Sequence, residues 1–467
     1  MLNKTATELA AEMRKGQLKP SDLMAETLAR IDQINPQVNA IVALRDHDTL
    51  MAEARALDDA NPSGALFGLP LAVKDLQATK GITTTWGSPL YVEHVPETDD
   101  LLPARLRAAG AIIIGKTNTP EFGLGSHTFN PVYGVTRNPF DETRTPGGSS
   151  GGAAAALATG MLTVSDGSDM MGSLRNPAAW CGVWSLRPTI GLVPKGEQAD
   201  PILARLSTDG PMARRPGDLR LLLDVLAAPD PGWPIRPRLD PAGAAVLKGT
   251  RIGWLGDWGG TIPFENGILE TSAIALDAMA AAGAQIEHLN APFSQPDMWY
   301  AWETLRAWLI AAERKADYND PNKRAQLKSS ALWEVERGLA VTADDIYAAS
   351  ATRAGLTRAL LTLFERFDAL VLPTTQVWPF PTESEYPTVI AGVEMPTYHR
   401  WMEVVVPVSL SGLPAAGIPA GFDARGLPAG LQLIGPPGSD YRLIALAEAW
   451  EDAAGELIKP PENPLIH

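Results

Sequence analysis

Helix-to-strand junctions constrain the fold of this chain more than any other feature of its sequence. A helical pattern over residues 101–109 stops at Gly110 and leads into the apolar stretch 111–114. A similar junction runs from Met279 through Gly283 to Ile286. A glycine that ends a helix and precedes a short apolar run is typical of a helix that feeds a parallel strand. We therefore predict an α/β fold built from layers of helices and strands.

Strand and helix candidates continue along the whole chain. Thr5 and Glu8 match a capping box that opens a first helix. Ser21 is predicted to cap a second helix, which ends at Asn35-Pro36. Composition does not shift enough to divide the chain in two. Short apolar runs predict strands at 41–44, 69–74, 161–165, 251–255, 368–372, 404–408 and 431–434.

Tryptophans gather in the stretch 290–350, which is expected to be helical. The residues are Trp299, Trp302, Trp308 and Trp333. Because Trp299 and Trp302 are spaced as i and i+3, they share one face of a helix. Core packing is the first interpretation of such a stripe, and the wall of a substrate pocket is the second.

Charge and cysteine usage argue against several classes of function. The formal charge is −15 and no block of Lys or Arg stands out, so no nucleic-acid partner is expected. The single cysteine, Cys181, lies in an apolar segment that predicts a buried, inert thiol. Zinc-binding spacings are missing, so neither a metal nor another cofactor is predicted. No signal-peptide pattern or bilayer-spanning stretch is visible, which favours a cytoplasmic protein without a membrane partner.

Ser149 lies in a glycine-rich segment in front of an alanine-rich helix. This helix is predicted from Ala153 and ends at Gly160. A serine at a helix N-terminus meets free N–H groups and the positive end of the helix dipole, which favour negative charge. Taken alone, such a serine is more often an ordinary N-cap than a catalytic residue.

Ser173 is predicted to lie in a loop at the end of a strand. The strand covers 161–165 and the turn covers 166–172, so Ser173 stands where α/β sheets place their ligands. Backbone N–H groups of such a turn can form an oxyanion hole, and Arg175 can pair with Asp169 to fix the loop. The alternative interpretation is a plain glycine-serine turn.

Lys74 ends the apolar strand 69–74. Neighbouring strand residues point to opposite faces, so Asp75 need not pair with it. A lysine that faces a sheltered site loses solvation, which lowers its pKa and leaves a neutral amine able to act as a base. The alternative is a lysine that extends from the strand end to water. If Lys74, Ser149 and Ser173 converge, they supply a base, a relay hydroxyl and a nucleophile for acyl transfer without histidine.

The segment Gly-x-Ser149-x-Gly also matches the nucleophile elbow of hydrolases with a Ser-His-acid triad. That arrangement needs a strand directly before the serine, and Pro146 argues against a central strand there. None of the later histidines, His288, His399 and His467, stands in a recognisable catalytic context. We therefore rank this interpretation below the lysine–serine one.

The glycine- and serine-rich segments resemble the signature of the amidase signature family. The strongest matches are Pro-Gly-Gly-Ser-Ser-Gly-Gly at 146–152 and Gly-Ser-Asp-Met-Met-Gly-Ser-Leu-Arg-Asn-Pro-Ala at 167–178. Supporting matches lie at 68–75, 115–118, 137–139, 181–182, 411–414 and 426–432. The resemblance is specific over residues 65–195 and 403–450 and vague over 196–402, the segment expected to shape the substrate pocket.

The resemblance implies a single α/β domain over residues 1–467, with a twisted mixed central β-sheet flanked by α-helices. It also implies a Ser–cis-Ser–Lys triad with Ser173 as nucleophile, Ser149 as relay and Lys74 as base. The residues implied around this triad are Met170, Met171 and Gly172, whose backbone N–H groups hold the oxyanion, and Ser168, Asp169 and Arg175, which support the site.

One residue departs from the family pattern. Members usually carry a Gly-Gly pair before the nucleophile, and Met171 replaces the first glycine here. A turn that needs positive φ at this position would be strained. The flexible side chains of Met170 and Met171 are expected to border the substrate pocket.

The function implied by the resemblance is hydrolysis of non-peptide amides through an acyl-enzyme on Ser173, with esters and carbamates as further substrates. The tryptophan-rich middle of the chain points to apolar or aryl substrates. A second hypothesis is a subunit of a glutamine-dependent amidotransferase, and a third is a catalytically silent binding protein. The expected partner is a small molecule, and the choice between monomer and homodimer is open.

Overall fold

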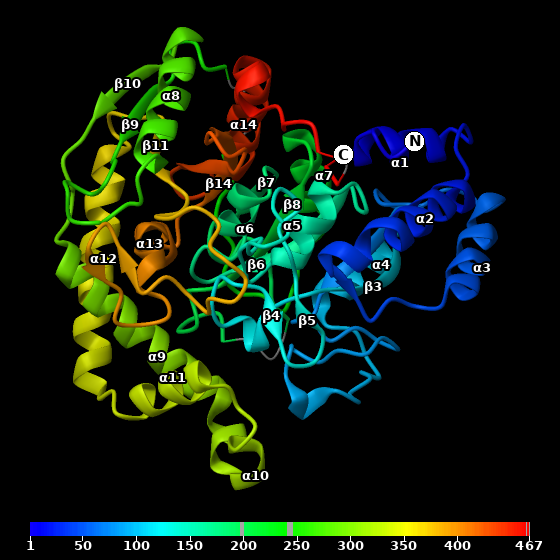
Figure 1. The fold of residues 1–467 in the computed structure, drawn as a ribbon, viewed down its shortest axis with the longest axis horizontal. Coiled ribbons are helices and arrows are strands. Elements are labelled where there is room, and N and C mark those ends of the chain that lie inside the picture. The colour runs from blue at the N-terminus through cyan, green and yellow to red at the C-terminus, as the bar shows by residue number, and fades with distance from the viewer. Residues whose placement is uncertain (197–199, 241–245, 464, 467) are drawn as a thin grey trace.

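An eight-stranded mixed sheet runs through the middle of the molecule (Figure 1). The computed structural model describes residues 1–196, 200–240, 246–463 and 465–466. Strand β9 pairs in parallel with β10 and β11, and the remaining neighbours pair antiparallel. In spatial order the strands are β10 (Gln285–His288), β9 (Arg251–Trp254), β11 (Ala369–Pro373), β15 (Pro428–Ile434), β14 (Ala415–Phe422), β7 (Trp184–Arg187), β8 (Thr208–Ala213) and β6 (Val164–Asp169). The predicted α/β fold with a mixed central sheet is confirmed.

A second sheet of three strands lies beside the edge strand β6. Its order is β1 (Ile41–Val42), β3 (Ile112–Thr117) and β2 (Pro70–Lys74). The two sheets meet at Lys74, whose backbone N–H donates to the carboxylate of Asp166 on β6 at 3.1 Å. This contact places the C-terminal end of β2 next to β6.

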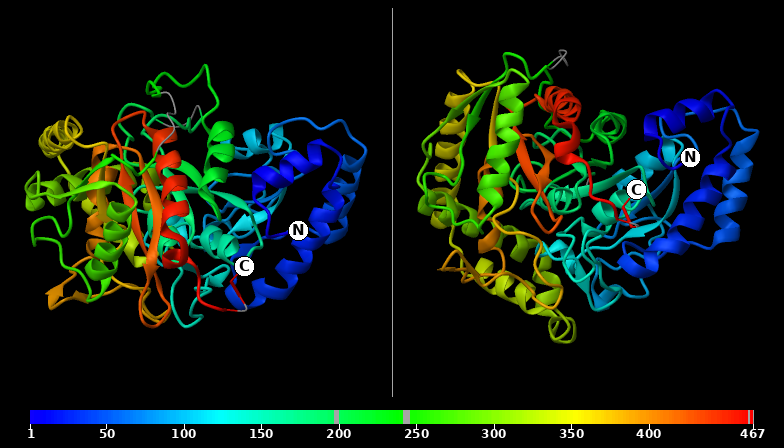
Figure 2. Two further views of the ribbon diagram at one scale, coloured as in Figure 1. Left: turned by 90° about the horizontal axis from the view of Figure 1, so that it is seen from above. Right: turned by 45° about the horizontal axis from the view of Figure 1, so that its top comes forward.

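Helices surround both sheets (Figures 1 and 2). Helices α1 to α4 lie around the three-stranded sheet, and α9, α11 and α12 lie at the opposite end of the molecule. The helices are α1 (Ala6–Arg14), α2 (Pro20–Val38), α3 (His47–Asp58), α4 (Leu101–Ala108), α5 (Gly151–Ala158), α6 (Arg175–Trp180), α7 (Pro216–Leu226), α8 (Ile268–Ala281), α9 (Gln295–Asn319), α10 (Pro321–Arg324), α11 (Ser329–Leu339), α12 (Ala343–Leu363), α13 (Val406–Ser411) and α14 (Asp440–Ala454). Within the described ranges, none of these helices has the length and apolar character of a membrane span.

The alanine-rich helix α5 lies in the interior, and every one of its residues is buried. Gly152 allows a very close approach to the residue that follows β3, because a Cβ at Gly152 would lie 2.3 Å from the backbone nitrogen of Asn118. Apolar helices without a polar face are typical of buried positions. The packing of α5 therefore fixes the segment in front of it, which carries Ser149 and Ser150.

The polar strand β6 extends further than the sequence predicts. We expected a strand at 161–165 and a turn at 166–172, but the strand covers Val164–Asp169 and the turn begins at Met170. Asp166 and Ser168 are therefore strand residues that face the end of β2, since both contact Lys74. Polar side chains inside a buried strand are satisfied here by tertiary contacts, which local sequence does not reveal.

The strand predicted at 404–408 is wrong. Residues Arg400–Val405 form a 3-10 helix and Val406–Ser411 form α13, and the strand of this region is β14. A short apolar run that is buried on all sides has no periodicity that separates strand from helix. Strands β7 and β8 also carry no prediction from the sequence.

The first two helices show one prediction confirmed and one wrong. The capping box of Thr5 and Glu8 is present at the start of α1. Helix α2 begins at Pro20 instead of after a Ser21 cap, and Pro36 lies inside its last turn. Ser21 donates to Asp58 at 2.6 Å instead of capping the helix.

Candidate active site

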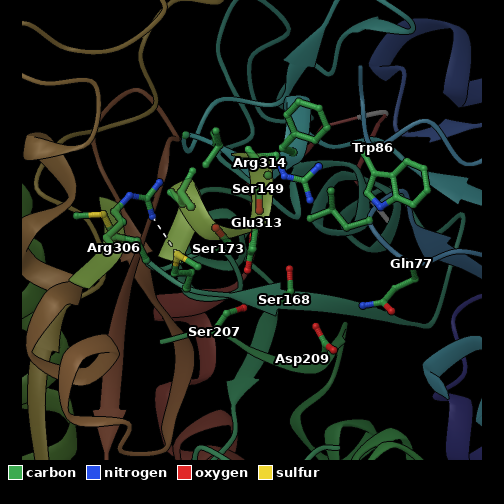
Figure 3. Close-up of a pocket in the computed structure, with 18 of the residues that line it drawn as sticks. Gln77, Trp86, Ser149, Ser168, Ser173, Ser207, Asp209, Arg306, Glu313 and Arg314 are labelled. Carbon is green, nitrogen blue, oxygen red and sulfur yellow. Dashed lines mark hydrogen bonds between the residues drawn. The ribbon is translucent and has the colours of Figure 1, made fainter. Parts of the chain in front are cut away.

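A cavity of about 450 Å³ opens beside the C-terminal end of β6 (Figure 3). The hydroxyl-bearing residues Ser149, Ser168 and Ser173 line it. Its other walls include residues of the loop after β2, the turn after β6, strand β8 and helix α9. The lining residues include Leu76, Gln77, Trp86, Asp100, Phe122, Leu124, Met170, Met171, Lys195, Ser207, Asp209, Arg306, Ile310, Glu313, Arg314 and Met402.

Lys74 ends β2, and its buried side chain contacts the lining residues Ser149 and Ser168. Its Nζ lies 2.8 Å from Ser149 Oγ, 2.8 Å from Ser150 Oγ and 3.0 Å from Ser168 Oγ. Burial lowers the pKa of Lys74 to about 7, and the nearby carboxylate of Asp166 partly opposes this shift. A substantial fraction of Lys74 is therefore neutral near neutral pH.

Ser149 and Ser150 stand directly before α5. Ser150 occupies the N-cap position, but its side chain makes no capping hydrogen bond. Its hydroxyl contacts Lys74 instead, so the interpretation of this serine pair as an ordinary cap does not hold. The peptide bond between Gly148 and Ser149 is cis.

Ser173 ends the turn that follows β6 and lines the cavity. Its backbone carbonyl accepts the N–H of Ser150 at 3.2 Å, which ties the two serine segments together. Within the described ranges no hydrogen bond joins the hydroxyls of Ser149 and Ser173, although both face the same cavity (Figure 3). Ser149 and Ser173 thus line one cavity, and Lys74, which is not a lining residue, contacts Ser149.

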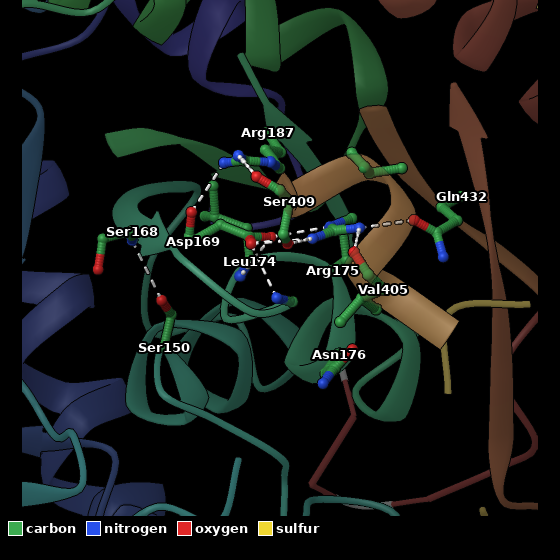
Figure 4. Close-up of polar contacts among 12 residues, drawn as sticks. Ser150, Ser168, Asp169, Leu174, Arg175, Asn176, Arg187, Val405, Ser409 and Gln432 are labelled. Carbon is green, nitrogen blue, oxygen red and sulfur yellow. Dashed lines mark hydrogen bonds and ion pairs between the residues drawn. The ribbon is translucent and has the colours of Figure 1, made fainter. Parts of the chain in front are cut away.

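Asp169 holds the turn in front of Ser173 (Figure 4). Its carboxylate accepts the N–H of Gly172 at 2.8 Å and the N–H of Leu174 at 3.3 Å. It also pairs twice with Arg175, at 2.9 Å to Nε and 3.0 Å to Nη2. Burial alone would raise the pKa of Asp169, but Arg175 and these hydrogen bonds hold it well below its usual value. The predicted pair of Asp169 and Arg175 is present.

Residues from the C-terminal part of the chain complete this network. Arg175 donates to Gln432 Oε1 at 2.6 Å and to Ser409 Oγ at 2.9 Å, and Arg187 donates to the carbonyl of Asp169 at 2.8 Å. Sequence reasoning assigned these supporting residues no role. The sequence does contain one signal for this network, which is Gln432 inside the apolar strand β15. A buried side-chain amide needs polar partners, so its presence there indicates a polar network.

The anticipated strain at Met171 does not occur. Met171 is absent from the described residues with positive φ, and Gly172 adopts φ 79° instead. The Met171 side chain is buried in an apolar cluster that includes Trp180 and Trp401. The glycine that the turn requires is therefore still in place.

Two of the three N–H groups predicted at the oxyanion are free to donate. The Gly172 N–H is occupied by Asp169. Among the described residues, no acceptor contacts the N–H groups of Met170, Met171 or Ser173. A tetrahedral oxyanion beside Ser173 thus has unpaired donors in the same turn.

Other sequence candidates lie away from the cavity. Cys181 is buried and burial raises the pKa of its thiol, in line with the predicted inert cysteine. Trp302 is a core residue, as the first interpretation of the tryptophan stripe expects. His399 is buried beside Trp299 and Trp333, and His467 lies outside the described residues. In the described part of the chain, no cluster of His, Cys, Asp and Glu is arranged to bind a metal ion.

Comparison with known proteins identifies the family of this chain. A family model described as Amidase matches residues 22–444. The chain belongs to the amidase signature family. The match also spans residues 196–402, where the sequence resemblance is vague.

Three amidase signature relatives illustrate the range of the family. The chain is 36% identical to a glutamyl-tRNA(Gln) amidotransferase subunit of Thermus thermophilus, over 96% of this chain and 97% of that protein. It is 31% identical to an acylamidase of Rhodococcus erythropolis, over 99% of this chain and 98% of that protein. A crystal structure of a bacterial aryl acylamidase superimposes with a TM-score of 0.88 at 28% identity, covering 97% of this chain and 96% of that one. These amidase signature relatives support an enzyme that acts on amide C–N bonds.

Proposed function

We propose that this protein hydrolyses non-peptide amides through an acyl-enzyme on Ser173. The observation that carries the proposal is the buried amine of Lys74, which lies 2.8 Å from Ser149 and has a pKa lowered to about 7. A neutral buried amine next to a hydroxyl is a competent general base near neutral pH. Ser173 lines the same cavity and supplies the nucleophile.

In the proposed reaction, the neutral amine of Lys74 takes the proton of Ser149 while Ser149 takes the proton of Ser173. The oxygen of Ser173 then attacks the amide carbonyl, and the oxyanion accepts hydrogen bonds from the N–H groups of Met170 and Met171. Ser149 next donates its proton to the leaving nitrogen, and the C–N bond breaks. Water enters by the same relay, cleaves the ester and releases the carboxylate, so amide and water give acid and amine.

Apolar and aryl amides are the proposed substrates. The cavity wall carries aromatic and aliphatic side chains, among them Trp86, Phe122, Leu124 and Ile310. Such groups surround the bulk of a ligand, while a few polar groups orient its reacting bond. Because the attacked carbonyl is similar, esters and carbamates are proposed as further substrates.

The test is a parallel assay of aryl amides, aryl esters, carbamates and primary amides with the wild-type protein and the Lys74→Ala and Ser173→Ala variants. We expect wild-type turnover of anilides and loss of at least about a thousandfold in both variants. Full activity of either variant would contradict the proposed triad. A fluorophosphonate probe followed by peptide mass spectrometry checks the silent alternative, which predicts no adduct on Ser173.

The second candidate is a role within a glutamine-dependent amidotransferase, and the 36% identity to a subunit of such an enzyme favours it. In that role the isolated chain should release ammonia from glutamine slowly without partner chains. Rapid turnover of a hydrophobic anilide by the isolated chain favours hydrolysis as its main activity. The cytoplasmic location and the monomeric or homodimeric state stay predictions, with gel filtration as the measurement for the latter.

A further inference from the structure

A buried arginine on α9 faces the catalytic cavity. Arg306 lines the cavity, and only 3% of the residue is exposed. In Figure 3 it lies on one side of Ser173, whereas Gln77 and Trp86 lie on the other. A buried guanidinium carries a large desolvation cost and needs hydrogen-bond acceptors around it.

Two of the three nitrogens of Arg306 have strong oxygen acceptors. Nε donates to Glu334 Oε1 at 2.7 Å, and Nη2 donates to the hydroxyl of Tyr398 at 2.6 Å. The Tyr398 hydroxyl in turn donates to the same Glu334 oxygen at 2.7 Å. These contacts lock the guanidinium plane in one orientation relative to the cavity.

The third nitrogen has a weak acceptor. Among the described residues, the contact of Arg306 Nη1 is the thioether sulfur of Met170 at 3.2 Å. A thioether accepts hydrogen bonds poorly, so this donor is under-used for a buried charged group. Met170 belongs to the turn that ends at Ser173, so this under-used donor contacts the turn that carries the nucleophile.

Two other cations line the cavity, Arg314 and Lys195, and both are only partly buried. Arg314 is bridged to Asp317 at 3.4 Å and lies over Phe122, and Lys195 donates to Ser207 at 3.0 Å. The acidic lining residues are Asp100, Asp209 and Glu313. Asp209 lies on β8, and Glu313 is exposed to solvent.

We propose that Arg306 Nη1 binds an oxygen acceptor of the substrate, so the preferred substrates are amides that carry a second oxygen function, a carboxylate or a carbonyl, near the scissile bond. This inference rests on the proposed amide hydrolysis. A donor that is already fixed loses no rotamer freedom when it binds, which strengthens discrimination. Charge-assisted hydrogen bonds of this kind correspond to about 10- to 100-fold in kcat/KM.

The experiment compares matched substrates that differ in the oxygen function. On the acyl side these are succinanilic acid, its neutral amide N-phenylsuccinamide and the hydrocarbon analogue 4-methylpentananilide. On the amine side they are 4-acetamidobenzoate and 4-isopropylacetanilide. The two sets determine on which side of the scissile bond Arg306 acts, and the acyl set separates a carboxylate from a neutral carbonyl.

For the wild-type protein we expect kcat/KM to be about 10- to 100-fold higher for an oxygen-bearing substrate than for its hydrocarbon partner in at least one set. In Arg306→Lys that ratio should fall at least about tenfold, because the oxygen-bearing substrate should lose more kcat/KM than its hydrocarbon partner. The matched control is Arg337→Lys, because Arg337 pairs with Glu303 at 2.8 Å and is not a lining residue of the cavity. This control should leave the ratio unchanged.

If Arg306→Lys does not fold, Tyr398→Phe provides a second variant. Loss of the hydroxyl frees Nη2 and loosens the guanidinium, so the oxygen-to-hydrocarbon ratio should fall while the Ser173 adduct with fluorophosphonate still forms. Equal kcat/KM within both sets for the wild type overturns the inference but keeps the proposed function. A uniform loss across all substrates in Arg306→Lys also overturns it, since that is the signature of a structural role. Absence of any turnover and of any Ser173 adduct overturns both.

Discussion

The carboxylate of Asp169 binds the guanidinium of Arg175 through two parallel hydrogen bonds, and both side chains are fully buried. The same carboxylate accepts the N–H of Gly172. Gly172 directly follows Met170 and Met171, whose N–H groups are proposed to hold the oxyanion. One ion pair therefore connects the conformation of the nucleophile turn to the interior of the protein.

Asp169→Asn should destabilise the protein strongly. The substitution leaves Arg175 without its buried counter-charge, and removal of one partner from such a pair costs about 3–5 kcal/mol. Chemical denaturation measures the free energy of unfolding. The control is Glu287→Gln, because Glu287 pairs with Arg366 at an exposed position where the loss is about 0–1 kcal/mol. Equal stabilities of the two variants would contradict this account of the turn.

The activity should rise with pH around neutrality. Burial lowers the pKa of Lys74 to about 7, so the amine is protonated and unable to accept a proton below that pH and neutral above it. The kcat/KM of an uncharged anilide should therefore increase with pH and level off above about 8. Lys74→Arg should be inactive over the whole range, because arginine stays protonated. An activity that is independent of pH between 5 and 9 argues against lysine as the base.

Asp166 should shift this profile. Its carboxylate is buried, contacts the backbone N–H of Lys74, and has a pKa that burial raises to about 6. Above that pH its negative charge stabilises the protonated form of Lys74. The charges around it are Lys116 and Asp209, and they remain in the variant. In Asp166→Asn the acidic limb should therefore move to lower pH, by about one unit or less. An unchanged or upward-shifted limb would refute this role of Asp166.

The two residues before Ser173 should respond differently to substitution. Gly172 has φ 79°, and a Cβ there would lie 2.5 Å from Asn176 Oδ1, so Gly172→Ala should distort the turn and abolish most activity. Met171→Gly removes a buried side chain and should lower stability by about 2–5 kcal/mol, but it preserves the backbone N–H. Thermal unfolding together with kcat separates the two effects. A higher kcat for Gly172→Ala than for Met171→Gly would contradict these different roles of the two residues.

Cys181 should resist alkylation in the native state. The thiol is buried and its pKa is raised by burial, so the reactive thiolate is nearly absent. A thiol-specific reagent should label it only after denaturant is added. Rapid labelling of the folded protein, without loss of structure, would show that this side chain is accessible.

Local sequence carries much of the site but not its surroundings. Lys74, Ser149 and Ser173 are implied as a triad by the resemblance to the amidase signature family, whereas each of them alone fits an ordinary structural role. The partnership of Ser150 with Lys74 and the position of Asp166 under the lysine depend on contacts between β2, α5 and β6. Strand β2 lies far from α5 and β6 in the chain, and no local pattern encodes how it packs against them.

Helix and strand predictions fail for a related reason. The run 404–408 has strand-like composition, yet tertiary burial on all sides lets it form a helix. Arg306 lies within a helix that sequence reasoning assigned to core packing. Its orientation toward the cavity depends on Glu334 and Tyr398, which reach it from α11 and from the segment before Arg400.

Lys74 belongs to the three-stranded sheet, whereas Ser173 follows the edge strand of the eight-stranded sheet. The proposed base and nucleophile thus belong to two different sheets, which meet where the end of β2 lies beside β6. The catalytic rate should therefore depend strongly on how the two sheets are positioned relative to each other. Substitutions between β2 and β6 that leave every reacting group intact should still alter kcat. A misalignment of about 1 Å is enough to slow a reaction that depends on orientation.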